Sequence, residues 1–370
     1  MKPTMIAERL YSLDALRGFD MFWIIGAEEI FHDLSEITNA PFWNALSQQF
    51  QHPAWHGFTF YDLIFPLFLF LAGVATPYSI GKQLEKGVDS KALLSRVVKR
   101  GLILVFLGIV YNNRLEIRPL EQIRFGSVLG RIGLAYMFAN IIYLYFRKRG
   151  QMMWFVALLL GYWFLLMFNS APGFPMGDLS MEGNFVSYLD RSIIPGRLYR
   201  GIHDPEGLVA TIPAISTALL GIFVGNLLKE TPVDGKRATA VRLAVLGVVL
   251  IILAQIWNLI FPFNKNLWTS SFVLQCGGIS TLLMTAFYYL IDILGYKKWA
   301  FFFKVIGMNA ILIYMSKVFI DWSYTANAFF GWLGQLVGDP YNSVLMVFCF
   351  LGVQWALLYI LYKQKLFLRV

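Results

Sequence analysis

The sequence has few charged residues and almost no cysteine. Only 14% of its 370 residues are charged and 58% are hydrophobic, against about 25% charged and about 45–50% apolar in a typical soluble domain. So little polar surface cannot coat water-soluble domains of this length. The two cysteines, Cys276 and Cys349, lie in apolar stretches and exclude a disulfide scaffold or a thiolate metal cluster. The composition predicts an all-α polytopic membrane protein.

Ten segments are apolar and long enough to cross a bilayer, which takes about 20 residues per helix. They cover approximately 13–32, 60–81, 98–114, 125–146, 151–169, 208–228, 239–262, 270–294, 300–320 and 342–362. We expect one transmembrane domain over residues 1–370, with extracytoplasmic loops at about 33–59 and 170–207. Charged residues interrupt 13–32 and no clean cleavage site follows, so we expect a retained helix rather than a signal peptide.

The basic residues indicate the orientation. Most of the 31 Lys and Arg lie in alternate loops between these segments and near the two chain ends. The positive-inside rule then places those loops and both termini in the cytoplasm. The net charge of +9 therefore does not indicate nucleic acid. It would either attract a polyanionic ligand to the cytoplasmic mouth or reflect insertion topology alone, and both interpretations stay open.

Several ionisable residues fall inside the predicted spans, where a charge needs a partner or a function. Asp14, Arg17 and Asp20 are spaced three apart and favour an ion-pair stripe, whereas Glu28 remains a candidate for lining a cavity. Asp62 stands in the first turn of the second span. It either contributes to a ligand site or caps the helix start, and we weigh these two roles equally.

Outer loops hold the remaining candidates. All four histidines are expected there, and His52 and His56 have the four-residue spacing of a helical zinc pair. Pro53 and the lack of further ligands argue against a metal site. Two polar clusters lie in these loops. Asp204 and Glu206 belong to a turn, and Asn264, Lys265 and Trp268 are residue types that turns and sugar-binding sites both use. A Trp that anchors the chain at the membrane interface would give the same pattern.

Ordered motifs along the chain resemble the heparan-α-glucosaminide N-acetyltransferase family of transmembrane acyltransferases. The motifs are 12–18 (SLDALRG), 51–59 (QHPAWHGFT), 62–66 (DLIFP), 123–124 (IR), 128–131 (VLGR), 204–207 (DPEG), 264–269 (NKNLWT), 307–310 (GMNA) and 362–367 (YKQKLF). The resemblance implies acetyl transfer from cytoplasmic acetyl-CoA to the amine of a glucosamine-type sugar on the other side of the membrane.

The resemblance also implies site residues. His52 matches the family's catalytic histidine, and we expect Asp62 to orient it. Acetyl-CoA is assigned to Arg100, Arg369, Arg124 and Arg131, and the acceptor sugar to Asn264, Lys265, Trp268, Asp204, Glu206 and Glu28. No metal is expected. Residues 24–29 lack the asparagine that the family places near the acetyl group. The short form resembles bacterial relatives, so we expect a bacterial cytoplasmic membrane, lipid contacts and, as an open alternative, a homodimer.

Two mechanisms and two other functions stay open. His52 either deprotonates the acceptor ammonium or carries the acetyl group as an acyl-imidazole. The alternatives to N-acetyl transfer are a secondary transporter of an amino sugar, using Glu28, Glu29 and Asp62, and O-acetylation of a surface glycan. No internal repeat of the transporter type is visible in the sequence.

Overall fold

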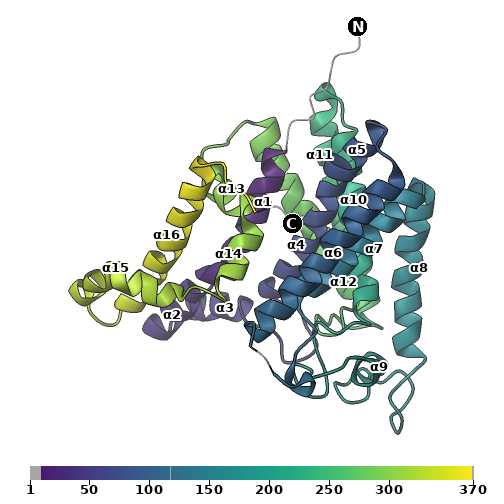
Figure 1. Ribbon diagram of the computed structural model, residues 1–370, viewed down its shortest axis with the longest axis horizontal. Coiled ribbons are helices and arrows are strands. Elements are labelled where there is room, and N and C mark those ends of the chain that lie inside the picture. The colour runs from purple at the N-terminus through teal and green to yellow at the C-terminus, as the bar shows by residue number, and fades with distance from the viewer. Residues whose placement is uncertain (1–9, 117, 369–370) are drawn as a thin grey trace.

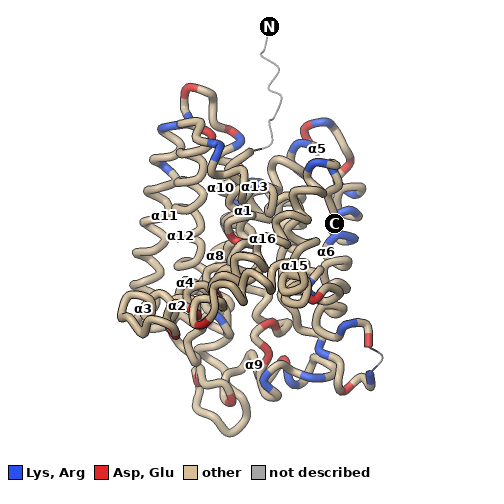
Figure 2. Tube along the Cα trace, turned by 90° about the vertical axis from the view of Figure 1, so that its left-hand side faces the viewer, with Lys and Arg blue, Asp and Glu red and all other residues tan. Residues whose placement is uncertain are grey.

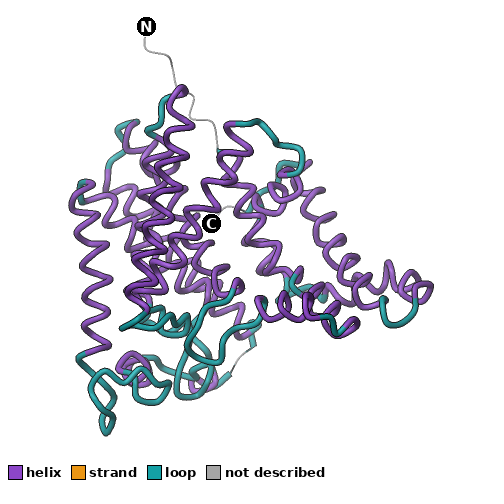
Figure 3. The backbone as a smooth tube through the Cα atoms, turned by 180° about the vertical axis from the view of Figure 1, so that it is seen from behind, coloured by secondary structure: helices purple, strands orange, loops and turns teal. Residues whose placement is uncertain are grey.

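The computed structural model describes residues 10–116 and 118–368, which form helices and loops without a strand (Figures 1 and 3). The α-helices are α1 (Tyr11–Phe22), α2 (Glu29–Thr38), α3 (Pro41–Gln49), α4 (Phe60–Thr76), α5 (Lys82–Glu85), α6 (Ser90–Asn113), α7 (Val128–Tyr145), α8 (Lys148–Met167), α9 (Phe185–Ile193), α10 (Thr211–Lys229), α11 (Lys236–Asn258), α12 (Ser270–Phe287), α13 (Ala300–Met308), α14 (Ala310–Ser316), α15 (Trp322–Val337) and α16 (Asn342–Lys363). The all-α prediction is confirmed.

Seven of the described helices are long and apolar enough to cross a membrane. They cover Phe60–Glu85, Val128–Tyr145, Lys148–Met167, Thr211–Lys229, Val233–Asn258, Ser270–Ile293 and Asn342–Lys363. Each corresponds to one of the ten expected spans. The expected span 98–114 lies within α6, and the expected spans 13–32 and 300–320 are broken helices.

The two breaks have local causes. Gly26 adopts φ +124°, a backbone conformation that ends the first helical run before α2 begins. At the second break, the Asn309 amide donates to the carbonyl of Leu366 at 3.0 Å and accepts from the amide of Leu368 at 3.0 Å. Asn309, which lies between α13 and α14, therefore holds the C-terminal tail with its side chain.

The segments expected as outer loops contain helices of their own. Residues 33–59 include most of α2 and all of α3, and residues 170–207 include α9. The sequence analysis also missed α15, which joins the last two expected spans. In Figure 1 these short helices lie at the lower end of the molecule, while α5 and the start of α11 lie at the upper end.

The start of α1 and the end of α16 lie at the same end of the bundle. The Lys304 ammonium on α13 is 4.2 Å from the ring of Tyr11, in α1, and 6.0 Å from that of Tyr362, in α16. Figure 2 shows charged residues gathered in the loops at the two ends, whereas the middles of α11 and α12 carry none. This distribution matches helices whose central turns face lipid.

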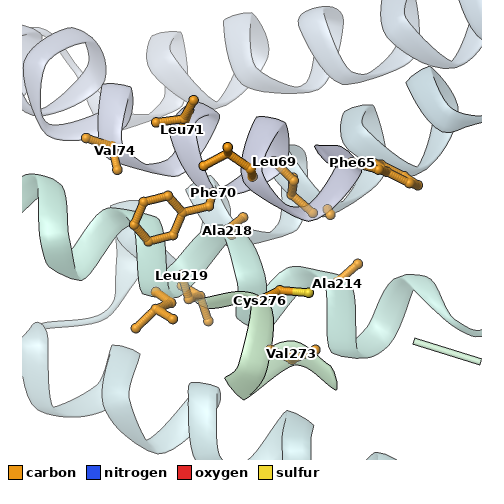
Figure 4. Close-up of a cluster of buried hydrophobic side chains, with 14 of the residues drawn as sticks. Phe65, Leu69, Phe70, Leu71, Val74, Ala214, Ala218, Leu219, Val273 and Cys276 are labelled. Carbon is orange, nitrogen blue, oxygen red and sulfur yellow. The ribbon is translucent and has the colours of Figure 1, made fainter. Parts of the chain in front are cut away.

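The centre of the bundle is packed by α4, α10 and α12 (Figure 4). Phe70 and Leu69 of α4, Leu219 of α10 and Cys276 of α12 are all fully buried. Glycine allows α4 and α10 to approach closely, because a Cβ atom built on Gly221 would lie 2.0 Å from the Phe70 carbonyl oxygen. This contact fixes α4, and α4 carries the site described below.

We predict that Gly221→Ala destabilises the protein. The added methyl group meets backbone rather than a flexible side chain, so the helices must separate, at a cost of about 1–3 kcal/mol. Gly161→Ala in α8 is the matched control, because nothing lies within 4 Å of its Cβ position. Thermal unfolding in detergent should show a lower Tm for Gly221→Ala alone. Equal Tm values for the two variants would contradict the close packing.

Candidate active site

Two chambers of opposite character meet at His52 and Lys265. The first, of about 200 Å³, lies between α1, α4, α7 and α14; its lining is apolar and includes Met21, Phe68 and Ile132. The second, of about 290 Å³, lies among the loops at the α9 end and is lined by polar and aromatic side chains. His52 and Lys265 are the two residues that line both. Together the chambers reach the lower end of the volumes usual for small-molecule sites.

His52 lies between a carboxylate and an ammonium group. Its Nδ1 is 2.7 Å from Oδ1 of Asp62, and its Nε2 is 2.9 Å from Nζ of Lys265. The bond to the carboxylate assigns the proton to Nδ1, which donates to Asp62. Because Lys265 Nζ is also 3.4 Å from Nδ1, the ammonium lies against the imidazole ring rather than in line with the Nε2 lone pair. The Asp62 side chain is 1% exposed, whereas the His52 side chain is 44% exposed. The imidazole of His52 is therefore partly exposed, whereas the carboxylate that holds it is buried.

Asp62 caps the helix start, one of the two roles that the sequence left open, and also contacts His52. Its Oδ2 accepts from the backbone amide of Thr59 at 3.1 Å, which caps the start of α4, while Oδ1 holds His52. The Thr59 hydroxyl in turn donates to the carbonyl of Gln51 at 2.7 Å. The helix start and the residue preceding His52 are thus tied to each other.

Two further contacts fix the His52 loop against distant segments. The Gly57 amide donates to the carbonyl of Phe263 at 2.9 Å, and the Trp55 indole donates to the carbonyl of Leu179 at 2.8 Å. Gly57 has φ +132°, a conformation that a side chain disfavours. The loop is therefore held by the segments before α9 and α12.

Lys265 projects from a tight turn that Asn264 and Trp268 stabilise. The Asn264 side chain accepts from the amide of Leu267 at 2.8 Å, and the fully buried Trp268 donates its indole N–H to Thr217 at 3.3 Å. Neither Asn264 nor Trp268 lines a chamber. The structure places Lys265, of these three predicted acceptor residues, at the site.

Burial lowers the pKa of Lys265, and the nearby Asp62 carboxylate opposes that shift. The Lys265 Nζ atom lies 3.8 Å from Oδ1 of Asp62. The amine is consequently easier to deprotonate than that of an exposed lysine.

Arg124 joins the wall of the polar chamber to the loop before α10. Its guanidinium donates to both carboxylate oxygens of Asp204, at 2.9 and 2.7 Å, and also to Glu206. Glu206 lines the polar chamber, whereas Asp204 does not. Although burial alone would raise the pKa of Asp204, the Arg124 guanidinium holds it below its ordinary value.

The other predicted residues are placed as follows. Arg131 is buried, donates to the carbonyl of Gly207 at 3.0 Å and lines neither chamber. Glu28 accepts from the hydroxyl of Tyr61 at 3.2 Å, and Arg100 lies against Tyr136, further along α7. Arg369 lies outside the described residues. Acetyl-CoA binding by Arg124 and Arg131 stays a prediction.

Sequence reasoning missed part of the chamber walls. Tyr61 lines the apolar chamber and its ring lies 5.0 Å from that of His52. Tyr199, Arg200 and Asn266 line the polar chamber. Asn266 falls within the 264–269 motif, but Tyr199 and Arg200 come from a loop without a recognisable pattern. Only the folded chain brings them to His52.

The described residues contain no group of three or more His, Cys, Asp and Glu side chains arranged to hold a metal ion. His56 contacts the Asn264 amide at 3.3 Å, whereas His52 contacts Asp62 and Lys265. The two histidines therefore have separate partners.

Comparison with known proteins gives the family. A family model described as heparan-alpha-glucosaminide N-acetyltransferase, catalytic, matches residues 9–251, well over half of the chain. This chain belongs to that family. It is 26% identical to the heparan-alpha-glucosaminide N-acetyltransferases of Mus musculus and Homo sapiens, over 98% of its own length. It spans 61% and 60% of the length of those two relatives.

We predict that Asp204→Asn destabilises the protein by about 3–5 kcal/mol, because it leaves the half-buried Arg124 without its two-oxygen partner. Glu116→Gln is the control, since Glu116 pairs with Arg118 at the surface, where an ion pair contributes about 0–1 kcal/mol. Unfolding in detergent at neutral pH measures both variants. Similar losses in the two would contradict the structural role of the Arg124 cluster.

The same pair predicts a pH dependence. Because the pKa of Asp204 is lowered from 3.8, its stabilising contribution is present above pH 3.8 and is lost as the pH falls through the lower folded-state value. The stability difference between wild type and Asp204→Asn should therefore stay constant from pH 7 to about pH 5. A difference that already disappears at pH 6 would contradict the assignment.

Proposed function

We propose that this protein transfers an acetyl group from cytoplasmic acetyl-CoA to the amine of a glucosamine-type sugar on the opposite side of the membrane. One observation carries the proposal: an imidazole held by a carboxylate lies at the junction of an apolar chamber inside the bundle and a polar chamber among the loops. The names of the relatives support the reaction class, because they are glucosaminide N-acetyltransferases.

On the donor side, α7 runs from the apolar chamber to the guanidinium group of Arg100. Ile132 lines the chamber, and Tyr136, one helical turn or about 6 Å further along the axis, contacts Arg100. The Arg100 guanidinium is 4.6 Å from the Tyr136 ring centre, and its Nε has no partner among the described residues. Arg100 would attract CoA phosphate, while the apolar chamber would accept the uncharged arm that carries the thioester.

On the acceptor side, the polar chamber offers complementary groups for an amino sugar. Glu206 supplies a carboxylate for an ammonium group, and the amide of Asn266 supplies donors and an acceptor for hydroxyls. The rings of Trp55 and Tyr199 supply apolar faces for a sugar ring. We assign this chamber to the acceptor and to the extracytoplasmic side of a bacterial cytoplasmic membrane.

His52 provides the acid–base chemistry in this scheme. Nε2 accepts a proton from the acceptor ammonium, and the Asp62 carboxylate stabilises the resulting imidazolium through Nδ1. The free amine forms a bond to the thioester carbon, the carbon–sulfur bond breaks, and His52 returns the proton to the thiolate of CoA. The second proton that the nitrogen loses on becoming an amide is released to water. Lys265 must first release Nε2, so binding of the acceptor displaces its ammonium group.

A covalent route uses the same geometry. Nε2 would attack the thioester to form an acyl-imidazole, which the acceptor amine then cleaves. Initial-rate kinetics separate the two routes: parallel double-reciprocal plots indicate the covalent one and intersecting plots the direct one.

We predict that His52→Ala abolishes CoA release. Purified protein is given acetyl-CoA with and without glucosamine, thiol release is followed, and the N-acetyl product is identified by mass spectrometry. Loss of the general base should lower kcat by about 10²–10⁴-fold. His32→Ala is the matched control, because His32 bonds Ser47 and lines neither chamber.

Three results would contradict the assignment. Release that survives in folded His52→Ala would remove His52 from the chemistry. Transfer to N-acetylglucosamine as fast as to glucosamine would indicate a hydroxyl acceptor. No release with any amino sugar by folded wild-type protein would contradict the acetyltransferase itself.

We also predict that Arg100→Ala raises the KM for acetyl-CoA about tenfold, the effect of losing one charge-assisted contact to phosphate. The KM for glucosamine should stay unchanged. Lys99→Ala is the control, because Lys99 carries the same charge on the exposed side of α6. Equal effects of the two variants would indicate general electrostatic attraction instead of a site.

A further inference from the structure

Lys265 lies next to the nitrogen that an acceptor amine must reach. Its Nζ is 2.9 Å from Nε2 and 3.4 Å from Nδ1 of His52, so a small rotation of its flexible side chain brings the amine in line with Nε2, within the distance of about 2.6–3.2 Å over which a base removes a proton. Both Lys265 and an amino sugar present a primary amine on a saturated carbon. Lys265 is therefore a residue of the protein itself that can take the place of the acceptor amine.

The surroundings of Lys265 favour its reaction. Burial lowers the pKa of this lysine, so more of the amine is free than at the protein surface. Its ammonium is also not locked in a two-oxygen ion pair: Asp62, at 3.8 Å, already accepts from His52 and from the Thr59 amide. Lys265 lines both chambers, so it borders the space assigned to the thioester.

Another lysine in the bundle illustrates the contrast. Lys317, at the end of α14, donates to the carbonyl of Ile24 at 2.7 Å and lines neither of the two chambers that meet at His52. A reaction that depends on His52 should therefore distinguish Lys265 from Lys317.

We propose that Lys265 is a self-acetylation site, modified by an acyl-CoA thioester when the acceptor chamber holds no sugar. The inference rests on the proposed function for the identity of the donor. Nε2 of His52 takes a proton from the Lys265 ammonium, Nζ bonds to the thioester carbon and the carbon–sulfur bond breaks. The proton on His52 then passes to the CoA thiolate, and the second proton that the nitrogen loses on becoming an amide is released to water. The products are N-acetyl-lysine and CoA, and no oxidant or metal is required.

Two properties follow from the geometry. The modification removes the positive charge beside His52, and the amide it forms is too stable to return the acetyl group, so at most one acetyl group is added at this position. An amino sugar protects Lys265, because both amines need the same nitrogen of His52.

The test is peptide mass spectrometry of the full-length protein in detergent after incubation with acetyl-CoA alone. We expect one acetyl group on Lys265 and at least about 100-fold slower modification in His52→Ala, the lower range for a lost general base. Lys317 and the exposed Lys86 report uncatalysed acetylation in the same digest. His52→Gln, checked for an unchanged Tm, provides a second variant in case His52→Ala is misfolded.

The outcomes separate this inference from the proposed function. Unmodified Lys265 in a preparation that acetylates glucosamine overturns self-acetylation and leaves the transferase standing. Modification that is equal in His52→Ala, or that excess glucosamine does not slow, also overturns it. Acetylation of Lys265 that depends on His52, in protein that accepts no amino sugar, supports the inference and overturns the acceptor assignment.

Discussion

The bond between His52 and Asp62 is the interaction on which the site depends. One carboxylate group closes the first turn of α4 and also accepts from the imidazole, at 3.1 and 2.7 Å. Because Asp62 is almost completely buried, leaving either of its oxygens without a partner would be expensive. The start of a membrane helix and the orientation of the histidine are therefore set together.

The position of α4 in turn depends on close helix packing. Gly73 and Gly221 bring α4 against α10, since a Cβ atom on Gly73 would lie 2.1 Å from the Ala218 carbonyl oxygen. Small residues at helix crossings are the usual way to pack helices in lipid, where apolar burial contributes little between them. The apolar chamber opens beside this rigid pair, against α1, α7 and α14. The closely packed α4 thus gives the apolar chamber a rigid wall, against which a transfer reaction can hold its two substrates in a fixed geometry.

Much of the helical architecture could be predicted, because long apolar runs are sufficient to identify buried or lipid-facing helices. His52 and Asp62 were found through a motif, and their contact agrees with the prediction. The breaks at Gly26 and Asn309 were not predicted, since each depends on one backbone conformation or one distant amide contact. The contact of Lys265 with His52 spans 213 residues. Sequence composition at Lys265 indicated only a sugar-binding residue type.

The central claim is that donor and acceptor approach His52 from opposite chambers. A cryo-electron microscopy structure with a bisubstrate analogue, CoA joined through an acetyl linker to the nitrogen of glucosamine, tests it directly. The account predicts the linker beside Nε2 of His52, the arm of CoA in the apolar chamber and the sugar among Glu206, Tyr199 and Asn266. A linker away from His52, or a sugar in the apolar chamber, would contradict it.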